Sequence, residues 1–257
     1  MRKLMIAGNW KMHLNTHEAS LLVHRLSERI DVHRNVEVVL APSTLCLQPL
    51  SLEIDRRKFR LAAQNAFYKD EGAFTGEVSF TMLRDLVHYC IVGHSERRAY
   101  FHDTLEVVRN KVEAAVRNGI TPILCIGETE HERKSGETKQ VLHDQLTTAL
   151  SNLTTNDVRD VVIAYEPVWA IGTGVTAKPA QIDEAVRFIR HNVAELYGQK
   201  VSEEVRVLYG AGVEPEYVAG VLSLDAGIDG LLVGGASLNY HKFSEIVNAA
   251  YRTRREN

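Results

Sequence analysis

The sequence predicts an α/β fold in which eight parallel strands and eight surrounding helices form a closed (β/α)8 barrel. Short apolar segments recur along the chain, and most are apolar at consecutive positions, as in parallel strands covered on both faces. The predicted strands occupy 4–7, 36–41, 59–63, 89–92, 122–126, 161–165, 205–209 and 231–233. Helical patterns lie between successive strands, and this alternation predicts an α/β fold.

Helical periodicity is clearest in four of the intervals. Apolar residues three and four positions apart predict amphipathic helices within 19–30, 105–116, 142–153 and 182–196. Weaker patterns follow the second, third, seventh and eighth strands. An open doubly wound sheet is the alternative, but eight units without a Pro/Gly/Ser-rich linker favour one barrel domain over 1–257.

Composition narrows the class of protein. Of the 257 residues, 45% are hydrophobic and 25% are charged, which is ordinary for a globular chain. The net charge of −3 gives no basic field, so we expect no nucleic-acid partner. No apolar run approaches the ~18 residues of a membrane span, so we expect no membrane partner. The widely spaced Cys46, Cys90 and Cys125 form neither a disulfide framework nor a zinc motif, which favours the cytoplasm.

Chemically active residues follow the predicted strands, where barrel enzymes place their sites. In chain order, they are Asn9, Lys11, Gln64, Asn65, His94, Ser95, Glu96, Gly127, Glu128, Glu166, Gly210, Gly212, Gly234 and Gly235. Taken singly, each fits a solvated charge, a structural histidine or a tight turn. Their convergence on one edge of a barrel makes coincidence a poor explanation.

The residue types at this edge predict proton transfer on a small phosphorylated molecule. Glu166 and His94 are a carboxylate and an imidazole, so one can take a proton while the other polarises an oxygen. Lys11 supplies a cation, and backbone N–H groups at Gly234 and Gly235 can hold an anion. No strand end carries a His/Cys cluster and no Gly-x-Gly-x-x-Gly motif occurs, so we expect no metal and no cofactor.

Five motifs resemble those of the triosephosphate isomerase family in order and spacing. They read Gly-Asn-Trp-Lys-Met at 8–12, Gln-Asn-Ala at 64–66, Val-Gly-His-Ser-Glu-Arg-Arg at 92–98, Ala-Tyr-Glu-Pro-Val-Trp-Ala-Ile-Gly-Thr-Gly at 164–174 and Gly-Leu-Leu-Val-Gly-Gly-Ala-Ser-Leu at 230–238. The resemblance implies a TIM barrel. It also implies interconversion of dihydroxyacetone phosphate and glyceraldehyde 3-phosphate through an enediolate, in glycolysis and gluconeogenesis.

The same resemblance implies a role for each site residue. Glu166 resembles the base, and His94 resembles a neutral imidazole that polarises the carbonyl, beside a helix that residues 95–97 could open. Asn9 and Lys11 resemble residues that stabilise the enediolate oxygens. The backbone groups implied to bind phosphate are those of Gly172, Gly212, Gly234 and Gly235. Supporting roles fall to Ser95, Glu96, Cys125 and Tyr209.

Two loops gain roles from the resemblance. The mobile lid would comprise Pro167, Val168, Trp169, Ala170, Ile171, Gly172, Thr173, Gly174, Val175, Thr176 and Ala177. Its closure would exclude water and slow the elimination of phosphate. The long segment 65–79, with Asn65, Phe74 and Thr75, resembles a loop that enters a second subunit, so a homodimer is expected.

Two places depart from the family pattern. The smaller departure is Val175, where the second hinge of the lid usually starts with Lys. Tyr-Gly-Gly-Ser-Val is usual after the seventh strand, and this chain has Tyr-Gly-Ala-Gly-Val at 209–213. Gly212 lacks the serine hydroxyl that would bind the closed lid, and Ala211 would be strained if its position requires a positive φ. The departures leave open an isomerase of a related ketose phosphate, such as a tetrulose phosphate. An inactive phosphosugar-binding protein is a further alternative, which the complete set of candidate catalytic residues disfavours.

Overall fold

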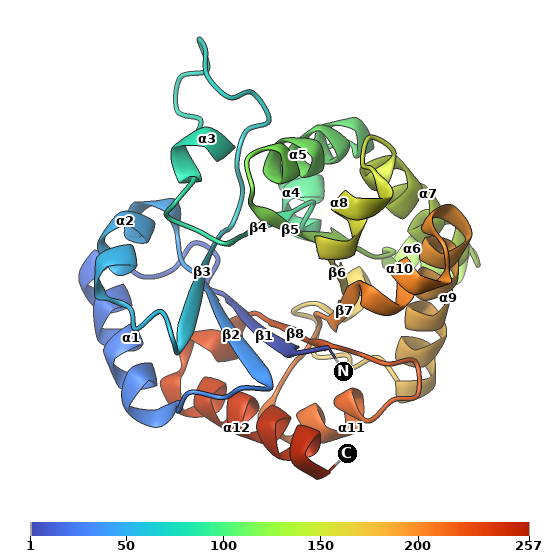
Figure 1. Ribbon diagram of the computed structural model, residues 1–257. Helices are drawn as coiled ribbons and strands as arrows, with labels where there is room; N and C mark the ends of the chain where they lie inside the picture. The colour runs from blue at the N-terminus through green and yellow to red at the C-terminus, as the bar shows by residue number, and fades with distance from the viewer. Residues whose placement is uncertain (1, 257) are drawn as a thin grey trace.

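Eight parallel strands close into a barrel in chain order, so that β1 pairs with both β2 and β8 (Figure 1). The computed structural model describes residues 2–256, and of residues 255 and 256 only the backbone. The strands are β1 (Leu4–Asn9), β2 (Val36–Ala41), β3 (Phe59–Ala63), β4 (Tyr89–Val92), β5 (Thr121–Ile126), β6 (Val162–Tyr165), β7 (Arg206–Tyr209) and β8 (Gly230–Val233). The predicted barrel is confirmed, and the open sheet is excluded.

Some strand bounds differ from the predicted ones for local reasons. β1 continues to Asn9, because that residue still pairs with Ala41 of β2. β6 and β7 each begin one residue later than predicted, because Val161 and Val205 end the short helices that precede them. At β5 and β8 the ladder takes in one residue more, namely Thr121 and Gly230, at the start of each strand.

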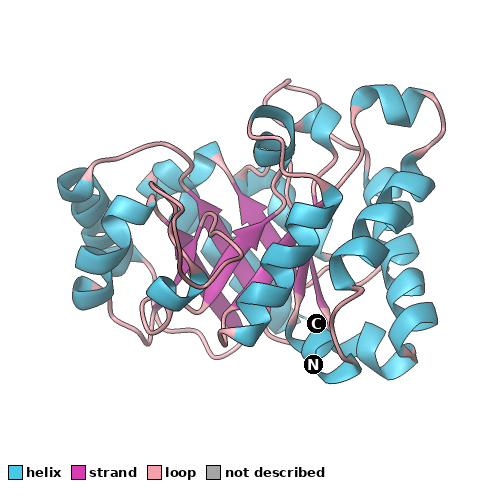
Figure 2. Cartoon of the chain, turned by 90° about the horizontal axis from the view of Figure 1, so that it is seen from above, coloured by secondary structure: helices cyan, strands magenta, loops and turns pink. Residues whose placement is uncertain are grey.

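Helices surround the barrel of strands on its outer side (Figure 2). In residues 2–256 the α-helices are α1 (Thr16–Arg29), α2 (Thr44–Glu53), α3 (Phe80–Leu83), α4 (Ser95–Tyr100), α5 (Leu105–Arg117), α6 (Glu130–Lys134), α7 (Thr138–Leu150), α8 (Thr155–Asp160), α9 (Pro179–Tyr197), α10 (Gln199–Glu204), α11 (Val218–Leu222) and α12 (Tyr240–Glu256). Helices α6, α8 and α10 exceed the predicted eight, and α4 was expected only from the resemblance. Each is five or six residues long, too short for an apolar stripe to mark it.

The start of α1 illustrates how the local sequence sets a helix. The Asn15 side chain accepts a hydrogen bond from the backbone N–H of Glu18, whose carboxylate accepts one from the Asn15 N–H in return. Apolar residues at spacings of three and four then pack on the barrel, namely Ala19, Leu22, Val23 and Leu26.

The interior of the barrel has different chemistry at its two ends. Its middle is filled by apolar side chains such as Met5, Val39 and Leu208. At the amino ends of the strands, Arg206 and the Tyr89 hydroxyl each donate a hydrogen bond of 2.8 Å to Glu37. The carboxyl ends open into a pocket instead.

Among the helices of residues 2–256, none has the length and apolar character needed to cross a membrane.

Gly230 provides a test of barrel closure. A β-carbon there would lie 1.9 Å from the Met5 carbonyl oxygen, whereas one at Gly220 in α11 would meet nothing within 4 Å. We expect Gly230→Ala to lower the free energy of unfolding by about 3 kcal/mol. Gly220→Ala should leave it unchanged or raise it slightly. Urea denaturation of both variants measures this, and equal stabilities would contradict the close β1–β8 contact.

Candidate active site

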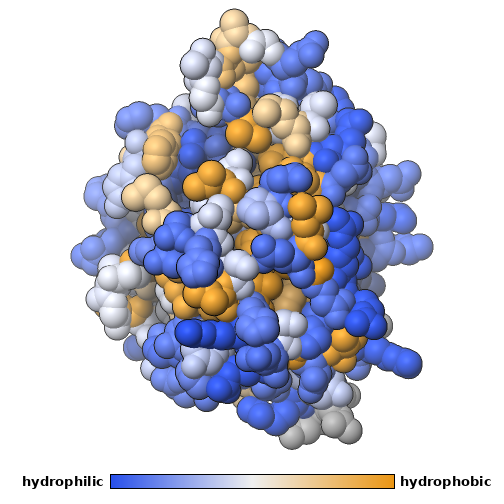
Figure 3. Space-filling view, turned by 90° about the vertical axis from the view of Figure 1, so that its left-hand side faces the viewer, coloured by the Kyte–Doolittle hydropathy of each residue, from blue (hydrophilic) through white to orange (hydrophobic). Residues whose placement is uncertain are grey.

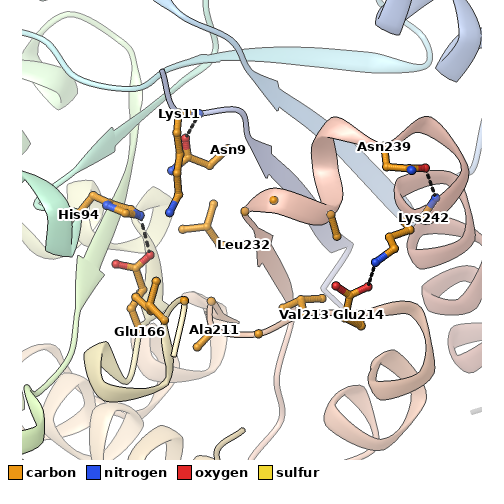
Figure 4. Close-up of a pocket in the computed structure, with 17 residues that line it drawn as sticks. Asn9, Lys11, His94, Glu166, Ala211, Val213, Glu214, Leu232, Asn239 and Lys242 are labelled. Atoms are coloured by element: carbon orange, nitrogen blue, oxygen red, sulfur yellow. Dashed lines mark hydrogen bonds and ion pairs between the residues drawn. The ribbon is translucent and has the colours of Figure 1, made fainter. Parts of the chain in front are cut away.

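A cavity of about 400 Å3 opens at the carboxyl ends of the strands (Figure 4). Its lining residues are Asn9, Lys11, His94, Glu166, Ile171, Gly172, Gly210, Ala211, Gly212, Val213, Glu214, Leu232, Gly234, Gly235, Ala236, Asn239 and Lys242. All the predicted catalytic and substrate-binding residues are therefore brought together. Of the predicted supporting residues, none lines this cavity, and each lies beside or beneath one that does.

His94 and Glu166 meet at the floor of the pocket. The His94 Nε2 atom lies 3.2 Å from Glu166 Oε1, and both residues are buried. His94 is the cap of α4, and its Nδ1 atom accepts a hydrogen bond of 3.2 Å from the Glu96 backbone N–H. A neutral ring that accepts at Nδ1 carries its hydrogen on Nε2. The predicted helix after His94 is thus present, and it directs an N–H donor into the pocket.

The surroundings of Glu166 leave space for its carboxylate. The Ser95 N–H donates to Glu166 Oε2 over 3.4 Å. A β-carbon at Gly210 would lie 3.1 Å from the Glu166 Cγ, and one at Gly127 would lie 1.8 Å from the Glu166 carbonyl oxygen. Gly127 is therefore required where β5 ends, and a side chain at Gly210 would force the Glu166 side chain to shift. Burial, and then the Glu166 charge, raise the pKa of the Cys125 thiol well above its usual range, so it stays protonated beneath the site.

Lys11 is held in a strained backbone conformation. Its φ of 53° is in the left-handed region, which costs a residue with a side chain about 1–2 kcal/mol. The Asn9 side chain accepts from the Lys11 N–H, and Gln64 donates to the Lys11 carbonyl oxygen. The Lys11 ammonium lies 2.6 Å from the Glu96 carboxylate, so Glu96 pairs with the cation of the pocket. Gln64 gains here a positioning role that its place after a strand did not reveal.

Glycines form the opposite side of the pocket. Gly235 opens a short 3-10 helix (Gly235–Leu238), so its backbone N–H belongs to the positive end of that helix. A β-carbon at Gly234 would approach the Lys11 side chain to 3.6 Å. Gly172 and Gly212 have left-handed φ values of 70° and 55°, and a β-carbon at either would meet nothing within 4 Å. The arrangement exposes backbone donors without a covering side chain.

The predicted lid is anchored at its first end by Glu128. This fully buried carboxylate accepts hydrogen bonds from the Trp169 indole at 2.9 Å, from Arg133 at 2.9 Å and from the Tyr165 hydroxyl at 3.2 Å. Burial, and then the Glu128 charge, raise the pKa of Tyr165. The sequence placed Glu128 after a strand but gave no sign of this function, because two of its partners, Tyr165 and Trp169, lie far along the chain.

The second end of the lid lies beside another cavity. Thr176, Ala177 and Tyr209 line this space of about 210 Å3. Within the described residues, the buried Tyr209 hydroxyl has no hydrogen-bond partner, and burial raises its pKa to about 12. The predicted dimer-loop residues lie apart from the pocket: Phe74 and Thr75 are exposed, and Asn65 accepts a hydrogen bond from Lys111.

The departures after β7 are accommodated differently from the expectation. Ala211 keeps a negative φ, so the expected strain from its β-carbon is absent in this conformation. The left-handed position is Gly212, with a φ of 55°. A serine there would be the strained residue. Gly212 lacks the hydroxyl of the family serine, and it also suits the left-handed backbone that this chain adopts at that position.

The fold and the pocket at its carboxyl ends define a class of protein, the (β/α)8-barrel enzymes. The family model of triosephosphate isomerase matches residues 4–250. The triosephosphate isomerase of Chloroherpeton thalassium is 45% identical over 252 residues, which cover 97% of this chain and all of that protein. Those of Geotalea uraniireducens and Clostridium perfringens are 46% and 45% identical, each covering 96% of this chain, and 98% and 100% of their own lengths.

The chain belongs to the triosephosphate isomerase family. The resemblance drawn from the five motifs is thereby confirmed, and the protein is an isomerase. The family match includes the segment after β7, so the Ala211 and Gly212 departures do not set the chain outside it.

Gly212 gives a direct test of the loop after β7. We expect Gly212→Ser to lower the free energy of unfolding by about 1 kcal/mol, because serine must adopt a left-handed φ. Gly235→Ser is the matched control, since Gly235 has open space and no positive φ. Urea denaturation of both variants at one protein concentration measures the difference. Equal losses in the two variants would show that φ at Gly212 is not the cause.

Proposed function

We propose that the protein interconverts dihydroxyacetone phosphate and glyceraldehyde 3-phosphate through an enediolate, with Glu166 as the base and His94 as the electrophile. The observation that carries the proposal is the 3.2 Å contact between His94 Nε2 and Glu166 Oε1 at the floor of the pocket. Family membership supports the choice of substrate and a place in glycolysis and gluconeogenesis. The tetrulose phosphate alternative is not favoured, because relatives similar over the full length are named triosephosphate isomerase.

The reaction needs one proton to leave carbon and return to its neighbour. The Glu166 carboxylate removes a proton from the carbon beside the carbonyl, and the electron pair moves onto the carbonyl oxygen. The Nε2–H of His94 donates to that oxygen, and the Lys11 ammonium offsets its growing negative charge. His94 gives its Nε2 proton to that oxygen and takes the proton of the neighbouring hydroxyl, whose oxygen becomes the new carbonyl. Glu166 then returns its proton to the former carbonyl carbon, which completes the exchange. Asn9 orients Lys11 through the hydrogen bond from the Lys11 N–H to its side chain.

Binding of the phosphate falls to the glycine side of the pocket. The backbone N–H groups of Gly172, Gly212, Gly234 and Gly235 are the proposed donors, and their lack of side chains supports close approach. Segment 167–177 closes over the substrate and excludes water, which protects the enediolate from losing phosphate. The exposure of Gly172 and Val175 supports this motion. Both residues lie between a first hinge, which is bound to Glu128, and the start of α9.

We further propose that the protein acts as a homodimer. Segment 65–79 projects away from the barrel (Figure 1), and its Phe74 is 41% exposed while contacting Phe67. Apolar atoms lie among polar ones on the side of the molecule that Figure 3 shows. Exposed apolar residues include Met12 after β1, Leu45 in α2 and Met82 in α3. An apolar surface of this kind is typical of an interface between subunits.

The proposed setting is the cytoplasm, where the chain works as one barrel domain. Cys46, Cys90 and Cys125 are buried and free, which supports a reducing compartment. Burial raises the pKa of the Cys90 thiol to about 12, so this group is unreactive.

Replacement of the proposed base tests the function. We expect Glu166→Gln to reduce kcat by about 10²–10⁴-fold with little change in folding, because the amide keeps the shape of the side chain and cannot accept the proton. A coupled isomerase assay measures kcat, and circular dichroism checks the fold. Glu130→Gln on exposed α6 is the control, which should keep full activity. A Glu166→Gln variant that retains a tenth of the activity would refute Glu166 as the base.

A charge in the projecting loop tests the dimer. We expect Thr75→Arg to shift the protein from dimer toward monomer, because a long cation overfills a packed interface. Sedimentation velocity across a concentration series measures the shift. Thr155→Arg is the control, since Thr155 is also exposed but lies in α8, away from the loop. A wild-type protein that is monomeric and fully active would contradict the proposal.

A further inference from the structure

An ion pair lines the pocket on the side opposite His94 and Glu166 (Figure 4). The Lys242 ammonium lies 2.9 Å from the Glu214 carboxylate. Glu214 belongs to the loop after β7, and Lys242 belongs to the start of α12. The pair therefore connects the loop that contains Gly212 with the helix that follows Gly234 and Gly235. Neither residue follows a strand directly, and the sequence gave no reason to single them out.

Lys242 occupies a position where a helix disfavours a cation. It is in the first turn of α12, where the helix dipole is positive and an acidic residue is favoured. The Asn239 side chain accepts hydrogen bonds from the backbone N–H groups of His241 and Lys242, which fixes the start of the helix. The hydrogen bond to Glu214 raises the pKa of the Lys242 ammonium, so it is charged at neutral pH.

The charges around the pocket do not suit an incoming dianion. Lys11 is paired with Glu96, and Lys242 is paired with Glu214. The third carboxylate, that of Glu166, faces a neutral His94. Two cations therefore stand against three carboxylates, and a phosphate dianion approaching this arrangement would meet a net negative charge. A cation that exchanges its carboxylate for the phosphate would add to the attraction of the proposed backbone donors and offset this negative charge.

We infer that Lys242 captures the phosphate group of the incoming substrate and that Glu214 restrains it until the phosphate arrives. This inference rests on the proposed function, which supplies a phosphorylated substrate. The Lys242 and Glu214 side chains are 50% and 37% exposed, and a pair so exposed is held weakly. Lys11, in contrast, is fixed by its strained backbone and by Asn9 and Gln64. The lysine stem is flexible, and a dianion attracts an ammonium more strongly than a single carboxylate does.

The exchange predicts opposite effects for the two members of the pair. We expect Lys242→Gln to reduce kcat/KM for glyceraldehyde 3-phosphate about five- to tenfold at low salt, mainly through KM, with kcat within a factor of two. Glu214→Gln frees the cation and should raise kcat/KM about two- to threefold. Both effects should shrink as ionic strength rises. For glyceraldehyde, which has no phosphate, neither variant should differ from the wild type.

The matched control is Lys139→Gln. Lys139 forms a similarly exposed pair with Glu184, 3.2 Å apart, and does not line the pocket. It changes the net charge of the protein equally, so it should leave kcat/KM unchanged. The inference is overturned if Lys242→Gln behaves like Lys139→Gln. It is also overturned if Glu214→Gln lowers kcat/KM as Lys242→Gln does, since the pair would then serve only to join the two segments.

Inorganic phosphate separates this inference from the proposed function. Failure of the proposed function would appear as a wild-type protein without isomerase activity. Titration calorimetry with inorganic phosphate still tests Lys242 in that case. We expect binding to weaken in Lys242→Gln and to strengthen in Glu214→Gln, and equal affinity in all variants would overturn the role of Lys242.

Discussion

Closure of the barrel is the constraint on which the rest of the structure depends. β8 reaches β1 because Gly230 has no side chain where the Met5 backbone passes. Closure places every strand's carboxyl end on one rim, so Asn9, His94 and Glu166 meet although they are far apart in the sequence. The apolar interior and the Glu37 cluster below it make this rim rigid, and a rigid rim is what a proton-transfer geometry requires.

Buried charges then fix the segments that carry the functional groups. Helix α4 is held by Asp103, which accepts a hydrogen bond of 2.9 Å from Arg97 and one of 2.6 Å from the buried Lys111. Lys111 also donates to Asn65, at the root of the projecting loop. Burial tends to raise the pKa of Asp103, but the bonds from Arg97 and Lys111 outweigh it and the pKa is lowered. The orientation of His94 is thus linked to the base of the proposed dimer loop.

The proposed motion is confined to segments that lack such anchors. Glu128 ties the first end of the proposed lid to the barrel, while the second end lies beside the Tyr209 hydroxyl, which has no hydrogen-bond partner within residues 2–256. The glycines that face the pocket have no side chain to pack, and the Glu214–Lys242 pair that lines it is exposed. For the proposed reaction, a fixed His94–Glu166 pair with adjustable surroundings would allow the substrate to enter without moving that pair.

The sequence by itself determined the barrel and most of the candidate site, for a local reason. Strand and helix periodicities are set by near neighbours, and the residues that end each strand, such as Lys11, His94 and Glu166, are found by position alone. Helices α6, α8 and α10 were not predicted, because five or six residues carry no apolar stripe. Glu128, Gln64 and the Glu214–Lys242 pair gained their roles only from tertiary structure, because their partners come from other elements. The tertiary structure also decided that the left-handed backbone falls at Gly212 and not at Ala211, since that angle depends on how the loop joins β7 to the segment beyond.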